Sequence, residues 1–94
     1  MNATNFDTFK ADALAAGFDE ALERQWAPDT VLETHSHAFT AEAVVTRGEM
    51  WLTCGDETQY LTPGSTFKLA ANVPHSERYG PEGATYWVAR RSAV

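Results

Sequence analysis

Turn-forming residues recur along the chain after Gly17, and most of the segments between them are short. Segments of about four to eight residues suit strands rather than helices. Many short strands joined by frequent turns are typical of a β-sandwich or a β-barrel. We therefore predict a mostly β protein with turns at 27–29, 48, 55–57, 63–64, 72–74 and 80–83. The predicted strands are 19–26, 31–37, 42–47, 49–54, 58–62, 65–69, 75–79 and 84–90.

One helix is predicted near the N-terminus, over residues 5–16. Asn5 or Thr4 can cap its first turn, and Gly17 can end it. Its apolar residues recur at helical spacing and are expected to share one face: Phe6, Phe9, Ala13 and Leu14. We expect an N-terminal helix within residues 1–17, followed by one β-barrel domain over 18–94.

The composition narrows the partners of the protein. Its 94 residues suit one domain with room for a modest ligand pocket. Thirteen acidic against seven basic residues give a net charge of -6, which disfavours nucleic-acid and membrane partners. No stretch resembles a secretion signal or a membrane span. The single cysteine, Cys54, excludes an intrachain disulfide and fits a reducing compartment, so we predict a cytoplasmic protein.

Two of the three histidines, His35 and His37, are separated by one residue and so share one face of an extended strand. His75 follows Pro74 at the start of a later strand. Glu42 has the wrong parity for the histidine face, so a turn or bulge before it would have to carry its carboxylate back. Three imidazoles and one carboxylate suit a divalent ion such as Fe, Mn, Ni, Co or Zn. On the residues alone, solvated histidines are an equally good interpretation.

Two longer motifs resemble those of the cupin superfamily. The segment HSHAFTAEAVVTRG contains His35, His37, Glu42 and Gly48 at the spacing of the first cupin motif, except that five residues rather than six separate Glu42 from Gly48. Gly55, TPG at 62–64 and ANVPH at 71–75 match the second, in a form similar to small stand-alone cupins.

This resemblance covers about residues 18–90 and has several implications. It implies a single cupin barrel, which is a jelly roll or double-stranded β-helix, with one N-terminal helix. It implies one divalent metal ion bound by His35, His37, Glu42 and His75. It also implies a homodimer, because cupins usually pair.

Aromatic and polar side chains near these motifs are candidates to line a pocket for a small-molecule ligand or substrate. Each of them could equally be a core residue. Glu77 could orient an imidazole or accept a proton, or it could be an exposed residue paired with Arg78 or Arg47. The candidates are Phe39, Tyr79, Trp26, Met50, Trp87 and Glu77.

The sequence leaves three functions open. The first is a metal-dependent enzyme such as a dioxygenase, isomerase or decarboxylase, which the cupin resemblance suggests. The second is a non-catalytic module that binds or senses a small ligand. The third is a barrel in which the metal is structural.

Overall fold

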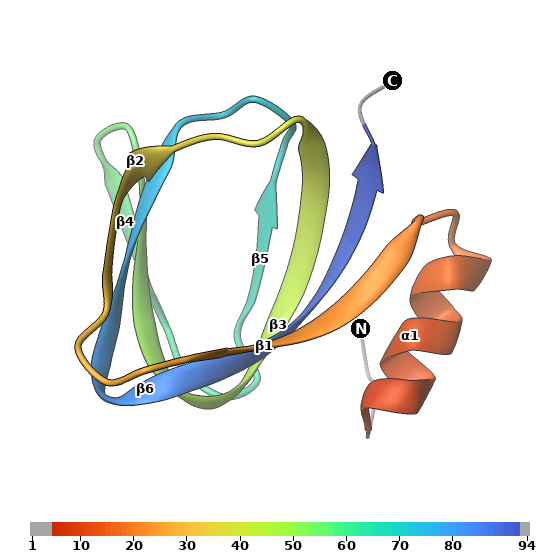
Figure 1. Cartoon of the computed structure of the whole chain (residues 1–94), viewed down its shortest axis with the longest axis horizontal. Helices are drawn as coiled ribbons and strands as arrows, with labels where there is room; N and C mark the ends of the chain where they lie inside the picture. The colour runs from red at the N-terminus through yellow and green to blue at the C-terminus, as the bar shows by residue number, and fades with distance from the viewer. Residues whose placement is uncertain (1–4, 93–94) are drawn as a thin grey trace.

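The computed structural model describes residues 5–92. Six antiparallel strands curl into a barrel, and one helix packs on its outside (Figure 1). Thr4 and the outer ends of the predicted segments 1–17 and 18–94 lie outside the described residues. The elements are α1 (Phe6–Ala15), β1 (Glu20–Trp26), β2 (Val31–His35), β3 (Phe39–Cys54), β4 (Glu57–Leu61), β5 (Thr66–Leu69) and β6 (His75–Ser92).

The strand order is β1-β6-β3-β4, with β2 also paired to β6 and β5 also paired to β3. The two long strands, β3 and β6, therefore form the frame of the barrel, and the four short strands close it. The mostly β content and the N-terminal helix agree with the sequence analysis. Within residues 5–92, no helix is long and apolar enough to cross a membrane.

The helix begins as predicted and covers the outer surface of the barrel. The side chain of Asn5 accepts a hydrogen bond from the backbone N–H of Thr8 at 2.8 Å, which caps the first turn. Phe9 and Ala13 are fully buried against the barrel. Leu14 is 46% exposed and does not share that face, because it lies five residues after Phe9 and so well around the helix axis.

Four of the predicted strands are joined in pairs. Segments 42–47 and 49–54 lie in β3, and segments 75–79 and 84–90 lie in β6. The predicted turns at Gly48 and Gly83 are instead sharp bends, and both glycines have positive φ. A Cβ on Gly48 would clash with the carbonyl oxygen of Gly83, so the two strands touch at this corner.

The bends also change which residues face inward. The register of β3 against β6 is irregular between Val45 and Arg47 and again between Gly48 and Met50. Val45 is buried before the bend and Met50 is buried after it, so inward positions change from odd to even numbers. Large apolar side chains fill one part of the barrel interior. The other part contains the polar residues of the site.

Candidate metal centre

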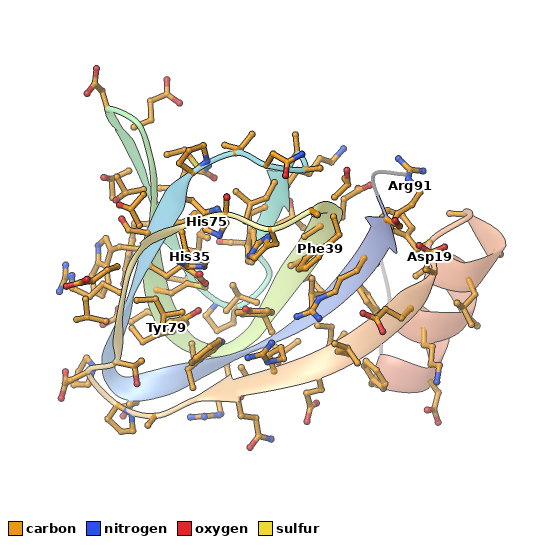
Figure 2. All side chains as sticks on the ribbon, turned by 45° about the horizontal axis from the view of Figure 1, so that its top comes forward. Asp19, His35, Phe39, His75, Tyr79 and Arg91 are labelled. Carbon is orange, nitrogen blue, oxygen red and sulfur yellow. The ribbon has the colours of Figure 1, made fainter. Side chains whose placement is uncertain are left out.

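The three histidines meet inside the barrel. His35 ends β2 and is directly paired with His75, the first residue of β6, while His37 lies in the loop before β3. One nitrogen from each of the three rings lies within 4.8 Å of the others. A register shift between Leu32 and His35 turns His35 to the same side as Leu32. Figure 2 shows His35 and His75 in the barrel interior.

Backbone carbonyls hold two of the rings in one orientation. Nδ1 of His35 lies 2.7 Å from the carbonyl oxygen of Glu33, and Nδ1 of His75 lies 2.9 Å from that of Val73. A carbonyl oxygen only accepts, so Nδ1 of each ring carries the hydrogen, and in the neutral ring Nε2 presents a lone pair. Nε2 of His75 is buried and has no hydrogen-bond partner among the described residues. These are the features of imidazoles that bind a metal ion.

His37 is held differently, by an aromatic stack. Its ring lies 4.3 Å from that of Phe39, centroid to centroid, with an interplanar angle of 7°. Burial lowers the pKa of His37, and the neighbouring rings of His75 and His35 lower it further. His37 is therefore neutral near pH 7, which is the form that binds metal ions.

Glu77 supplies a buried carboxylate beside the histidines. It is 7% exposed, so its interpretation as a surface residue paired with Arg78 or Arg47 is wrong. Its Oε2 lies 3.3 Å from Nε2 of His35 and 3.8 Å from Nε2 of His75, and its Oε1 accepts a hydrogen bond from the Tyr79 hydroxyl at 2.6 Å.

The short approach of Glu77 to His35 needs a positive centre between the two atoms. A carboxylate oxygen and an unprotonated Nε2 are both acceptors, so a proton or a metal ion must lie between them. Ligand atoms held about 2.0 to 2.1 Å from a tetrahedral ion are about 3.3 to 3.4 Å apart, by simple geometry. The 3.3 Å separation therefore fits either a proton or a shared metal ion, and the donor set as a whole fits a divalent one.

Glu42 does not lie where the sequence analysis expected it. The pairing of β3 with β5 is regular from Ala41 to Val44, so no bulge turns the carboxylate inward. Ala41 and Ala43 are buried, and the intervening Glu42 points outward. Its Oε1 lies 3.6 Å from Nζ of the exposed Lys68. The structure thus brings three of the four predicted ligands together and leaves Glu42 outside.

A cavity of about 160 Å³ opens beside the histidines. This volume is below the range of about 300 to 1,000 Å³ for pockets that bind drug-sized molecules, so the cavity suits a small molecule. Three predicted pocket residues, Trp26, Phe39 and Glu77, line it. The other lining residues are Arg24, Leu32, His35, His37, Ala41, Phe67, Leu69, His75, Tyr86 and Arg90.

The other three predicted pocket residues do not line this cavity. Tyr79 lies behind Glu77, to which it donates a hydrogen bond. Met50 is fully buried in the apolar core. Trp87 alternates with the inward-facing Tyr86 and so lies on the outer side of β6, where it packs against the helix.

Two arginines in the cavity wall were missed by the sequence analysis. Arg24 lies between the inward residues Leu22 and Trp26 on β1, and Arg90 continues the inward alternation of Tyr86 on β6. Alternation along β1 could have shown that Arg24 faces inward. Alternation along β6 could not show this for Arg90, because the bend near Gly83 changes which residues face inward.

Comparisons with known proteins agree on the architecture. Residues 17–92 match the model of a family described as AraC-like ligand binding domain. A Rhizobium leguminosarum bv. viciae protein of unknown function has a similar structure, with a TM-score of 0.75, 17% identity and coverage of 98% of this chain and 97% of that one.

Two further structures are similar. A DMSP lyase structure (RdDddP and RnDddQII) gives a TM-score of 0.72 at 23% identity over 79% of this chain, which spans only 38% of that protein. The Cupin_2 domain of an XRE family transcriptional regulator from Enterobacter cloacae gives 0.64 at 18% identity, with coverage of 77% and 79%. A search of curated proteins found no match. At these identities the likenesses show the fold alone.

Proposed function

Since the chain belongs to the family of AraC-like ligand-binding domains, a cupin-type family, we propose that its barrel binds one divalent metal ion and, beside it, a small organic molecule. The predicted membership of the cupin superfamily and the predicted jelly-roll barrel are confirmed. The metal centre, its ligands and the bound molecule are our proposal.

The convergence of three imidazole nitrogens within 4.8 Å carries this proposal. Two of these rings are fixed by carbonyl oxygens so that Nε2 faces the shared volume, and Nε2 of His75 has no other partner. A buried lone pair without a hydrogen-bond partner destabilises the fold, and a metal ion bound to Nε2 of His75 would remove this cost. The proposed ligands are His35, His37 and His75.

We assign the carboxylate of the site to Glu77, on the basis of its distances to His35 and His75. Three nitrogen donors and one oxygen donor suit Fe(II), Mn(II), Co(II), Ni(II) or Zn(II). The hydroxyl of Tyr79 holds the other oxygen of Glu77 and so fixes the direction of the carboxylate. When bound, the metal ion would supply Lewis acidity toward an oxygen of the bound molecule.

Two uses of this site remain as candidate functions. In a metal-dependent enzyme, such as a dioxygenase or an isomerase, the site would bind and orient a substrate that is then converted. In a binding or sensing module, the site would only hold its ligand. The description of the matched family as a ligand-binding domain favours the second use.

Calorimetric titration of the metal-free protein with Zn²⁺ or Mn²⁺ tests the metal centre. We expect one ion per chain, with binding lost in His35→Ala and kept in Glu57→Ala, a change in an exposed residue of β4. Equal binding by the two variants would contradict the proposed ligands. Oxygen uptake or product formation with the loaded protein would then identify an enzyme, whereas ligand binding without turnover would identify a sensor.

The predicted homodimer is also a proposal. Light scattering of the full chain at micromolar concentration should give twice the mass of one chain. A monomer under these conditions would contradict it.

A further inference from the structure

The cavity beside the histidines carries an excess of positive charge that the metal centre does not use. Arg24 and Arg90 line it, and Glu77 is the only acidic residue that does so among those described. The whole chain has a net charge of -6, so two arginines in one small cavity contrast with the rest of the surface. With a divalent ion held by Glu77 and three neutral imidazoles, the cavity lining would carry a net charge of about +3.

Neither arginine is neutralised by a buried partner. The guanidinium of Arg90 lies 3.6 Å from Glu20, but Glu20 is half exposed and such an ion pair is weak. Nε of Arg90 is buried and has no hydrogen-bond partner in the described part of the chain. Arg24 has no ion pair within residues 5–92, and its guanidinium lies 4.8 Å from the ring centre of Trp26.

Arg90 is placed next to the metal centre by the same stack that holds His37. Its guanidinium lies 4.7 Å from the ring centre of Phe39, on which His37 also stacks. Arg90 also lines the cavity together with His37. Figure 2 shows Phe39 on the inner side of the barrel, whereas Arg91, the next residue after Arg90, lies at its outer margin.

Three residues of the cavity wall have a buried polar atom without a hydrogen-bond partner. These atoms are Nε2 of His75, Nε of Arg90 and Nε1 of Trp26, and no other buried side-chain nitrogen or oxygen of the described residues lacks a partner. The Trp26 N–H lies near the Tyr86 hydroxyl but makes no hydrogen bond of normal geometry with it. Two of the three atoms are donors, so a ligand that paired with them would offer acceptors.

We propose that the ligand of this site is a small organic carboxylate whose carboxylate group is bound by Arg90 and Arg24. Guanidinium groups pair with planar carboxylates through two parallel hydrogen bonds. The remaining wall, which includes Leu32, Phe67 and Leu69, is apolar and suits a short carbon chain. This inference rests on the proposed function, since the metal ion would hold the other end of the ligand.

Glycolate and glycolamide are matched probes, because they share one skeleton and differ in charge. The full chain is first loaded with Zn²⁺, and the binding of each probe is measured by calorimetry. We expect glycolate to bind at least about tenfold more tightly than glycolamide. Arg90→Met should weaken glycolate binding by about tenfold, and Arg24→Met should weaken it in the same direction. Arg91→Met, a change in the neighbouring outward residue, should leave it unchanged.

The outcomes separate this inference from the proposed metal centre. The Zn²⁺ affinity of each arginine variant is measured first. It should equal or exceed that of the unchanged protein, because the removed charge repels the ion, and such binding also shows that the variant folds. Normal Zn²⁺ binding with no preference for glycolate, including no binding of either probe, overturns the carboxylate assignment and leaves the metal centre standing. Tighter binding of inorganic phosphate than of glycolate also overturns it. Failure to bind Zn²⁺ refutes the proposed function and, with it, the inference.

Discussion

Replacing Glu77 with glutamine should weaken metal binding without weakening the metal-free fold. The carboxylate lies 3.3 Å from Nε2 of His35 and is 7% exposed, so water screens it little. Loss of its charge should reduce metal affinity by about tenfold to hundredfold, or about 1.4 to 2.7 kcal/mol. In the metal-free protein, the new amide N–H can donate to Nε2 of His35, while the amide oxygen still accepts from Tyr79. The melting temperature without metal should therefore stay the same or rise.

Glu42→Gln is the matched control for this change. Glu42 faces Lys68, whose side chain is 79% exposed, and surface ion pairs contribute about 1 kcal/mol or less. Its metal affinity should be that of the unchanged protein. Calorimetric Zn²⁺ titration and thermal unfolding of both variants, each with and without metal, give the answer. If Glu42→Gln weakened binding and Glu77→Gln did not, the assignment of the carboxylate would be refuted and the ligand set implied by the cupin motif would be correct.

Three further predictions concern metal removal, alkaline pH and the helix. Removing the metal with a chelator should lower the melting temperature of the unchanged protein but not that of His75→Ala. Metal binding at an ion concentration of about 100 Kd adds about 2.7 kcal/mol to the free energy of unfolding. An equal shift in both proteins would contradict the proposed site. Burial, with a smaller effect of Glu77, raises the pKa of Tyr86 above 10.0. The contribution of Tyr86 to stability is therefore complete below pH 10 and is lost as the pH rises beyond it. Denaturant unfolding across this range should show a smaller loss of stability in Tyr86→Phe, and an equal loss would show that Tyr86 is not its cause. Phe9→Ala removes a fully buried ring and should cost about 3 to 5 kcal/mol, whereas the half-exposed Leu14→Ala should cost less than about 1 kcal/mol in the same unfolding assay.

The overall fold was predictable because local signals dominate it. Asn5 and the apolar residues at helical spacing predict the helix, and the recurring turn residues predict a barrel. The joining of the predicted strands was not predictable, because Gly48 permits a bend as well as a turn. What makes it a bend is the contact with Gly83, which is 35 residues further along the chain.

The candidate site was predictable where strand parity applies. His35 and His37 point into the same volume as expected, although His37 lies in the loop after β2, and His75 is brought opposite His35 by the pairing of β2 with β6. Parity alone placed Glu42 away from the histidines, and the bulge assumed in order to satisfy the motif is absent from the pairing of β3. Glu77 has the parity of His75, but its burial depends on the closure of the barrel around it, which no local pattern reveals.

The central claim is that three histidines hold a metal ion inside this barrel. A crystal structure of the protein loaded with Zn²⁺, with the ion located by its anomalous scattering, tests this most directly. We predict one ion at about 2.0 to 2.1 Å from Nε2 of His35, Nε2 of His75 and one ring nitrogen of His37, with Glu77 turned toward it. An ion elsewhere, or no ion between these rings after loading, would contradict the account.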